Sequence, residues 1–241
     1  MDNAMLTLSD VHTHIAQYHI LQGVNLTVPR NGTTMLLGRN GAGKTTTMRT
    51  IIGLWRASQG AINFDGEEIT STATPDIAQR GIAYVPENMG IFSDLSVREN
   101  LLLAATSGAI DEQRLQWLVG IFPALGTFWN SRAGNLSGGQ KQMLAIGRAV
   151  IEPRRLILID EPSKGLAPAI VNALIEAVLE LKAMQTTILM VEQNFHMASA
   201  VGDTVAVMDD GRIIHSGTMA ELVDDTALQA RLLGLSMDSH Q

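Results

Sequence analysis

Hydrophobic and polar positions in the first part of the chain predict short strands interrupted by one helix. Residues 6–28 have the pattern of short strand-like stretches, and Thr33–Gly38 is a β-rich run that ends in glycine. A helical composition follows over Thr45–Ile52, with a glycine after it as a C-terminal cap. Ile62–Phe64 has the pattern of a hairpin arm before an Asp-Gly turn, and 81–85 is a further short apolar strand.

The rest of the chain is first helical and then alternates between strand and helix. Residues 96–150 are mostly compatible with helix. Beyond them, strand-like and helix-like segments alternate at 155–160, 169–184, 186–192, 195–200 and 204–208, and two short helical stretches follow. This alternation predicts a largely parallel sheet. We therefore expect one α/β domain over residues 1–241, with a mostly helical insertion at about 88–150.

Composition excludes several classes of protein. Hydrophobic residues make up 46% of the 241 residues, which is enough for a sizeable core. There is no cysteine, so disulfides, thiolate metal sites and cysteine nucleophiles are excluded. The formal charge of -7 disfavours nucleic acid as a partner.

The hydrophobic runs are too short for a membrane span. A spanning helix needs about 20 consecutive apolar residues, and the longest runs end at Asp160 and Glu192. The start of the chain carries an acid where a signal peptide carries basic residues. We expect a soluble chain, whose role at a membrane would come through a partner.

The segment GRNGAGKT matches the phosphate-binding P-loop pattern. Glycines let backbone N–H groups converge on an anion, and the helix that follows points its positive end at the phosphates. The lysine would reach the outer phosphates, and the threonine hydroxyl would ligate Mg²⁺. The residues predicted to contact nucleotide are Gly38, Arg39, Asn40, Gly41, Ala42, Gly43, Lys44, Thr45 and Thr46. This motif alone leaves kinases, GTPases and motor ATPases open.

Two acidic residues follow the apolar strand in LILIDEP. Ligands of open α/β sheets bind at the carboxyl ends of the strands, which is where Asp160 and Glu161 are expected. We predict that Asp160 holds Mg²⁺, through water, and that Glu161 polarises the water that attacks the γ-phosphate. The alternative is a pair of solvated acids that end a strand.

A second glycine-bearing segment, LSGGQ, precedes a helical stretch. One interpretation is a serine N-cap followed by glycines, which is a common helix start. The second interpretation is an anion site at a helix N-terminus. In that case the residues in contact with the anion would be Ser137, Gly138, Gly139 and Gln140.

With these three motifs in this order, the chain resembles the nucleotide-binding subunit of ATP-binding-cassette (ABC) transporters over nearly its whole length. GRNGAGKT is similar to Walker A, LILIDEP to Walker B and LSGGQ to the ABC signature. The segments YVPE, FSDLSVRENL, EPSKGLAP and VEQN resemble the second ATPase of branched-chain amino-acid importers, a subgroup with relatives assigned to urea and amides.

The resemblance implies a fold, cofactors and partners. The fold would be an α/β P-loop cassette, in which a RecA-like, mostly parallel core carries an N-terminal antiparallel portion and a helical subdomain. ATP and Mg²⁺ would bind between two cassettes, identical or sisters, so that residues 137–140 act on nucleotide held by the partner. Integral membrane permease subunits and an extracytoplasmic solute-binding protein would complete the system, with this chain peripheral on the cytoplasmic face of the inner membrane.

Four positions differ from the general family pattern. Glu87 replaces the usual glutamine near Mg²⁺ and could still ligate the ion. Gln193 replaces the usual histidine; it can donate a hydrogen bond to the γ-phosphate but cannot carry a proton. Ala167 stands where the family has aspartate. The aromatic residue that stacks on adenine is expected near Ile15, where Tyr18 and His14 are nearby, with strand packing the expected role of Tyr18.

The retained residues favour a working ATPase, with Glu161, Gln193 and Lys44 as the catalytic groups. Within importers, the competing interpretation is a catalytically degenerate partner of a more active cassette. An exporter cassette is a rival within transporters, and a cassette protein of chromosomes or ribosomes is a rival outside them. The chromosomal type carries a long coiled-coil insert and the ribosomal type carries two cassettes, and neither feature is present in this sequence.

Overall fold

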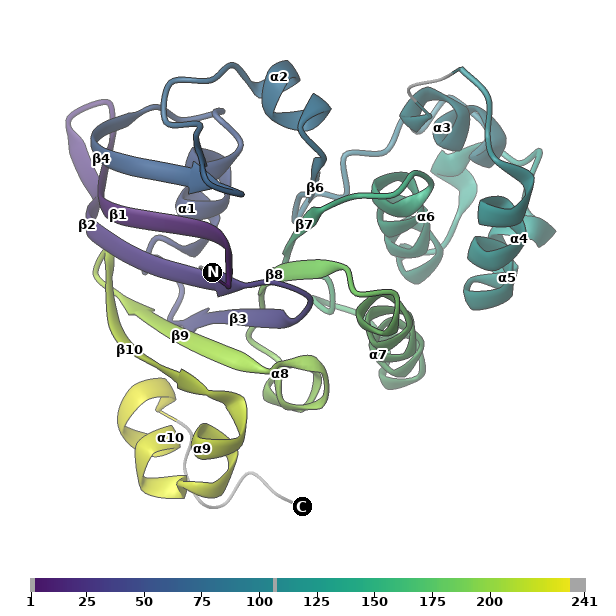
Figure 1. Ribbon diagram of the computed structural model, residues 1–241. Helices are drawn as coiled ribbons and strands as arrows, with labels where there is room; N and C mark the ends of the chain where they lie inside the picture. The colour runs from purple at the N-terminus through teal and green to yellow at the C-terminus, as the bar shows by residue number, and fades with distance from the viewer. Residues whose placement is uncertain (1–2, 106–107, 235–241) are drawn as a thin grey trace.

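The first sheet of the protein is antiparallel and is formed by the N-terminal part of the chain (Figure 1). The computed structural model describes residues 3–105 and 108–234. The strands of this sheet lie in the order β2-β1-β4-β5. Their bounds are β1 Ala4–Ile15, β2 Tyr18–Pro29, β4 Ala57–Phe64 and β5 Glu67–Glu68.

The prediction of short strands in residues 6–28 is wrong, because β1 and β2 are each 12 residues long. They form an antiparallel pair whose register shifts several times. At one shift, Asp10 has a φ of 50°. Opposite it on β4, Gly60 has a φ of +84°, and a Cβ there would lie 2.2 Å from the Asp10 carbonyl oxygen. Such irregularities interrupt the alternation of side chains on which strand prediction depends.

The second sheet is mostly parallel, as the alternation of strands and helices predicted. Its strands lie in the order β10-β9-β3-β8-β7-β6, and only β10 and β9 pair antiparallel. Every residue of β7 and β8 is buried, because a parallel sheet is covered on both faces. The bounds are β3 Thr33–Gly38, β6 Ile82–Val85, β7 Leu156–Asp160, β8 Thr187–Val191, β9 Thr204–Asp209 and β10 Arg212–Thr218.

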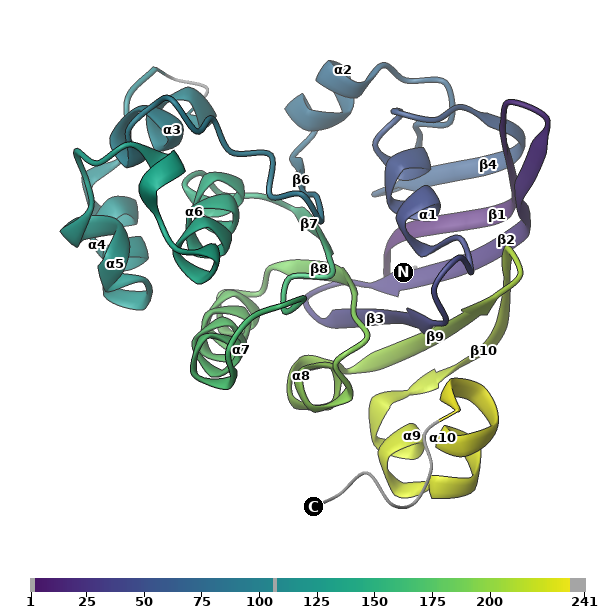
Figure 2. The same cartoon turned by 180° about the vertical axis from the view of Figure 1, so that it is seen from behind.

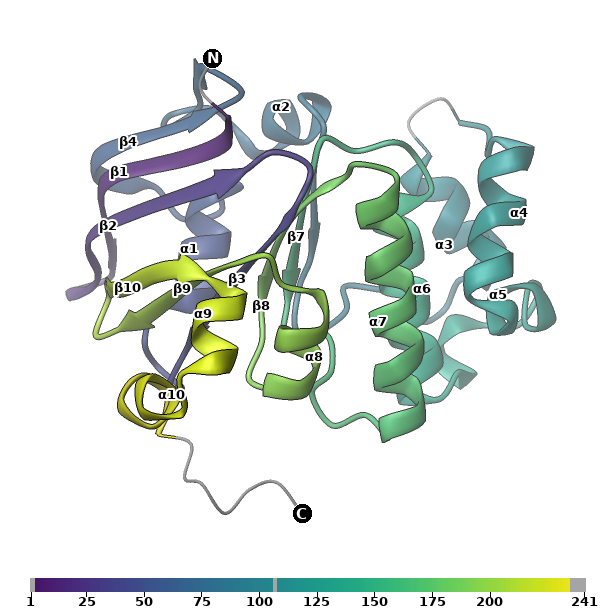
Figure 3. The ribbon, with the colours of Figure 1, turned by 60° about the horizontal axis from the view of Figure 1, so that its bottom comes forward.

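Helices cover both faces of the parallel sheet. On one face, α1 (Lys44–Ile51) packs between the two sheets, and Met48 and Ile51 share a core with Leu36 of β3 and Leu158 of β7. The opposite face is covered by α6, α7 and α8 (Figure 3). The bounds of these helices are α6 Gly138–Val150, α7 Pro168–Ala183 and α8 Phe195–Val201.

Of the remaining helices, α2 lies between the antiparallel sheet and the helical part, and the others lie farther from the centre (Figure 1). The helices α3 to α5 pack around α6, away from the antiparallel sheet, and α9 and α10 follow β10. Among the described residues, no helix has the length and apolar character needed to cross a bilayer. The bounds are α2 Thr74–Gln79, α3 Val97–Ala104, α4 Glu112–Ile121, α5 Pro123–Thr127, a 3₁₀ turn Ala133–Asn135, α9 Met219–Asp224 and α10 Thr226–Leu233.

Candidate functional site

The loop between β3 and α1 lies at the carboxyl end of a central strand and has the shape of an anion cradle. Gly38 has a φ of +140°, and a Cβ there would lie 2.1 Å from a carbonyl oxygen of β9. Gly43 caps α1 with left-handed backbone, and no side chain caps this helix end. The positive end of α1 is therefore available to a ligand.

Lys44 is folded back into this loop. Its Nζ donates hydrogen bonds to the carbonyl oxygens of Gly38, at 2.7 Å, and Arg39, at 2.9 Å. Burial lowers the pKa of Lys44, while the nearby carboxylates of Glu161 and Asp160 oppose that shift. The ammonium group thus lies within the loop, where its two carbonyl partners could be replaced by the oxygens of a bound anion.

Asp160 is fully buried at the end of β7 and is held by two hydroxyl groups. Thr45 Oγ1 donates to Oδ1 and Tyr84 Oη donates to Oδ2, both at 3.2 Å. Burial raises the pKa of Asp160, and these two hydrogen bonds act in the opposite direction. Burial and the Asp160 carboxylate raise the pKa of Tyr84 well above its ordinary value, so its hydroxyl stays a donor.

The Thr45–Asp160 pair fits a magnesium ion that takes its remaining ligands from nucleotide and water. Mg²⁺ prefers hard oxygen ligands and is usually bound through one or two protein groups plus phosphates. Within residues 3–105 and 108–234, no group of three or more histidine, aspartate or glutamate side chains is arranged to hold a metal. A magnesium ion held by this pair would take only part of its oxygen ligands from the protein.

Glu161 is held in place by its backbone and by both of its carboxylate oxygens. Its φ is 49°, and its backbone N–H donates to the carbonyl oxygen of Val191 at 2.9 Å. Gln193 Nε2 donates to Oε1 at 2.5 Å, and Lys164 Nζ lies 3.6 Å from Oε2. The same Gln193 amide donates to Asn40 Oδ1 at 2.7 Å. The structure thus brings together three predicted site residues from three separate segments.

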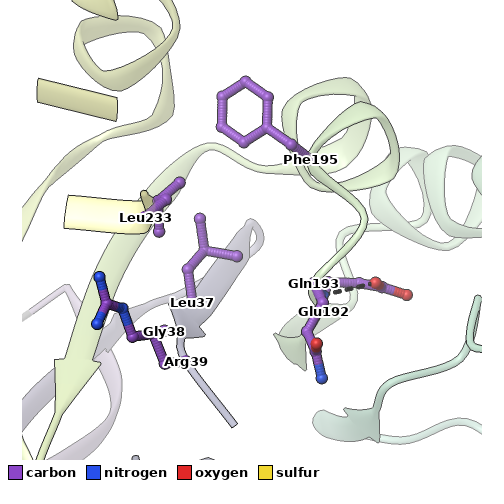
Figure 4. A pocket seen from close by; sticks show the side chains of 7 residues that line it. All are labelled: Leu37, Gly38, Arg39, Glu192, Gln193, Phe195 and Leu233. Atoms are coloured by element: carbon purple, nitrogen blue, oxygen red, sulfur yellow. Dashed lines mark hydrogen bonds between the residues drawn. The ribbon is translucent and has the colours of Figure 1, made fainter. Parts of the chain in front are cut away.

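A cavity of about 370 Å³ lies between the P-loop and Glu161. It is lined by Ile20, Asn40, Gly41, Gly43, Lys44, Thr45, Thr46, Glu87, Glu161 and Lys164. A smaller cavity of about 150 Å³ is lined by the end of β3, by Arg39 and by the segment after β8, and Figure 4 shows Glu192 and Gln193 on one side of it, opposite Leu37 and Arg39. The larger cavity holds six of the nine predicted loop residues together with Glu87 and Glu161, and it is the candidate site. Of the other three, Gly38 and Arg39 line the smaller cavity and Ala42 is buried.

The LSGGQ segment is not part of this cavity. Figures 1 and 2 show α6 and α1 on opposite sides of β6 and β7. Ser137 is the N-cap of α6: its hydroxyl accepts from the Gln140 N–H at 3.3 Å, and the Gln140 side chain accepts from the Ser137 N–H at 2.9 Å. Within one chain, the segment therefore caps the N-terminus of α6, which was one of its two predicted roles. Ser137 and Gly138 stay exposed.

Of the residues near the expected adenine-stacking position, Tyr18 differs from the prediction in its packing. Tyr18 is 63% exposed, so it does not pack against the strands as predicted. His14 stacks on His19 with a centroid distance of 4.2 Å. Ile20, two residues beyond Tyr18 on β2, lines the cavity.

Three residues of the site were missed at the level of sequence. Tyr84 supports Asp160, and Lys164 contacts both Glu87 and Glu161. Glu192 is 2% exposed and accepts backbone N–H bonds from Ser163, Gln193 and Asn194, each at 2.9 Å. Glu192 could have been found from the sequence, because it is an acidic residue that directly follows the apolar strand β8. The contacts of Tyr84 and Lys164 depend on the order of the strands.

The fold and the cavity define a P-loop nucleotide-binding ATPase. A family model described as "ABC transporter" matches residues 21–164, and the chain belongs to this family. It is therefore an ABC-type ATPase, which binds and hydrolyses ATP.

Similar proteins agree with this assignment. The chain is 36% identical to the Pseudomonas aeruginosa high-affinity branched-chain amino acid transport ATP-binding protein BraG, over 95% of this chain and 100% of that protein. It is 32% identical to the probable branched-chain amino acid transport ATP-binding protein LivF of Archaeoglobus fulgidus, over 96% and 99%. The lipopolysaccharide export system ATP-binding protein LptB of Haemophilus influenzae is 31% identical, over 96% and 98%. A nucleotide-free ATP-binding cassette from an ABC transporter superposes with a TM-score of 0.80 at 25% identity, over 97% and 99%.

Proposed function

We propose that this ATPase energises a membrane importer for branched-chain amino acids or similar small solutes. The observation that carries the proposal is a cavity lined by the P-loop and Glu161, whose lining residues Thr45 and Glu161 hydrogen-bond to Asp160 and Gln193. The relatives that transport branched-chain amino acids match nearly the whole chain, which supports this substrate class. The protein would work on the cytoplasmic face of the inner membrane, and the whole chain would be one ABC ATPase domain with a helical subdomain at about 88–150.

In this proposal the P-loop holds the triphosphate of ATP. The backbone N–H groups from Gly38 to Thr46 surround the phosphates, and Lys44 exchanges its two carbonyl partners for phosphate oxygens. Bound Mg²⁺ would supply positive charge to the phosphate oxygens, with Thr45 and Asp160 as its protein ligands and Glu87 as a further candidate. The side chains of Arg39 and Asn40 and the backbone of Ala42 complete the loop.

Glu161 acts on the attacking water. It accepts a proton as the water oxygen bonds to the γ-phosphorus, while the bond from that phosphorus to the bridging oxygen breaks and leaves ADP and phosphate. Gln193 cannot carry a proton, so its amide positions the glutamate through one N–H, and the second N–H, which donates to Asn40, would turn to a phosphate oxygen when ATP binds. Asn40, which shares the same amide, links this pair to the loop.

The signature segment completes a second site in trans. Ser137, Gly138, Gly139 and Gln140 would contact nucleotide held by a second cassette, identical or sister, since they lie apart from the cavity of their own chain. ATP would then join the two cassettes and its hydrolysis would release them. Tight dimerisation that depends on ATP, measured by analytical ultracentrifugation, tests this arrangement.

Permease subunits are the proposed membrane partners. A groove of about 540 Å³ runs between the parallel core and the helical part, and its lining includes Pro86, Met89 and Arg148. Pro86 and Met89 flank Glu87, so a partner seated in this groove would contact the loop that borders the nucleotide cavity. An extracytoplasmic solute-binding protein would deliver the transported solute.

A glutamate-to-glutamine substitution tests the proposed chemistry. Glu161→Gln should reduce ATP turnover at least a hundredfold, while ATP binding is retained, because only the proton acceptor is lost. The matched control is Glu176→Gln at an exposed position on α7, which should hydrolyse ATP at the parent rate. Turnover of Glu161→Gln at the parent rate would refute the assignment.

Uptake assays separate the competing transport functions. Reconstituted with its permease subunits and solute-binding protein, the ATPase should drive uptake of labelled leucine or valine. The 31% identity to a lipopolysaccharide-export ATPase supports a cassette of another transporter as the second candidate. In that case, or for a urea or amide importer, ATP would be hydrolysed without uptake of these amino acids. A degenerate partner cassette would bind ATP but turn it over only beside an active sister.

A further inference from the structure

Lys164 lies between two carboxylates of the nucleotide cavity. Its Nζ is 2.6 Å from Glu87 Oε1 and 3.6 Å from Glu161 Oε2. The two acids come from different strands: Glu87 follows β6 and Glu161 follows β7. Lys164 also lines the cavity together with Lys44, the cation of the P-loop. The cavity is thus bordered by a second lysine, outside Walker A, Walker B and the signature.

The charge of Glu87 creates a problem that this lysine solves. A carboxylate beside the triphosphate repels it, and Asp160 and Glu161 already place negative charge in the same region. The Lys164–Glu87 pair is neutral in sum, as an uncharged side chain at position 87 would be. The 2.6 Å contact between Lys164 Nζ and Glu87 Oε1 holds the two opposite charges together at the cavity.

We propose that Lys164 is a positioning residue that neutralises Glu87, so that the loop after β6 borders the nucleotide as an ion pair and not as a bare carboxylate. The inference rests on the proposed binding of ATP at the P-loop. It goes beyond that function because it links Lys164, after β7, to the loop of Glu87, which borders the groove proposed for the permease. The Lys164 and Glu87 side chains are 60% and 41% exposed. Because exposed ion pairs contribute little to folding, loss of the pair should change ATP binding more than it changes stability.

Magnesium-free ATP binding provides the direct test. Isothermal titration calorimetry in EDTA measures the Kd of ATP for the full chain and its variants, so no catalytic turnover is needed. Lys164→Met should weaken binding about five- to tenfold, as expected for one uncompensated charge several Å from a polyanion in a partly solvated site. Glu87→Gln should tighten binding by a similar factor. The double variant should bind within about twofold of the parent, and Lys164→Arg should behave like the parent.

Matched controls distinguish this effect from a general loss of charge or of folding. Lys182 forms an ion pair with Asp203 at 2.5 Å, away from the cavity lining, and Lys182→Met should leave the Kd of ATP unchanged. All variants should melt within about 2 °C of the parent, because exposed ion pairs stabilise the fold only slightly. Equal Kd values for Lys164→Met and the parent would overturn the inference, as would a double variant that binds as weakly as Lys164→Met. A parent protein that does not bind ATP would instead overturn the proposed function.

Discussion

The buried carboxylate of Glu192 ties together two segments that carry the proposed catalytic groups. Its Oε1 accepts the N–H of Ser163, and its Oε2 accepts the N–H groups of Gln193 and Asn194. Ser163 lies next to Lys164, and Gln193 contacts Glu161. The informative perturbation is Glu192→Gln, which keeps the shape of the side chain and removes one acceptor and the charge.

The size of the effect follows from these contacts. A glutamine has one acceptor oxygen, which can face either the Ser163 N–H or the N–H groups of Gln193 and Asn194, but not both sides. At least one hydrogen bond is therefore lost, and the glutamine NH₂ group is directed at a backbone N–H. A hydrogen bond to a charged group contributes roughly 1.5–3 kcal/mol, and an unsatisfied buried donor costs a similar amount. We expect a loss of about 2–3 kcal/mol in the free energy of unfolding. For a chain of this length that corresponds to a decrease in melting temperature of about 4–12 °C.

The assay is thermal unfolding followed by circular dichroism, with ATP turnover measured on the same preparations. Turnover should fall in Glu192→Gln at temperatures well below melting, because the backbone that carries Gln193 loses its anchor. The control is Glu176→Gln, an exposed substitution with the same charge change, which should stay within about 0.5 kcal/mol of the parent. If Glu192→Gln melted within about 1 °C of that control, the proposed anchoring would be refuted.

Two further predictions concern metal binding and pH. Tyr84→Phe removes the hydroxyl that donates to Asp160, so the Mg²⁺ concentration for half-maximal turnover should rise about tenfold or more, and an unchanged requirement would contradict the role of Tyr84. Loss of hydrating water, followed by the nearby rings of His14 and His12, lowers the pKa of His19 from its ordinary value of 6.5. As the pH falls, the unfolded chain therefore protonates His19 before the folded chain does. The contribution of neutral His19 to the free energy of unfolding is fully present above pH 6.5 and is lost as the pH falls below that value. The melting temperature should drop between about pH 7.5 and 5.5 by less in His19→Gln than in the parent, and equal drops would contradict this prediction.

The sequence alone determined those features that depend on contiguous residues. The P-loop is a continuous segment whose glycines, lysine and following helix carry their own geometry, so its residues and the start of α1 were predictable. Apolar runs bounded by polar residues likewise gave β7 and β8 with nearly correct bounds. The bulged strands β1 and β2 were not predictable at their true length, because shifts such as the one at Asp10 break the pattern.

The tertiary structure decided which of these segments meet. Parallel pairing in the order β3-β8-β7-β6 places the carboxyl ends of remote strands side by side, and that order follows from packing over the whole core. Only this placement brings the Tyr84 hydroxyl to Asp160 and Lys164 to Glu87. Each of these contacts joins residues from two strand ends, and neither partner carries a local signal of its counterpart. The motifs therefore fixed the kind of chemistry, while the folded sheet fixed the charges and hydrogen bonds that control it.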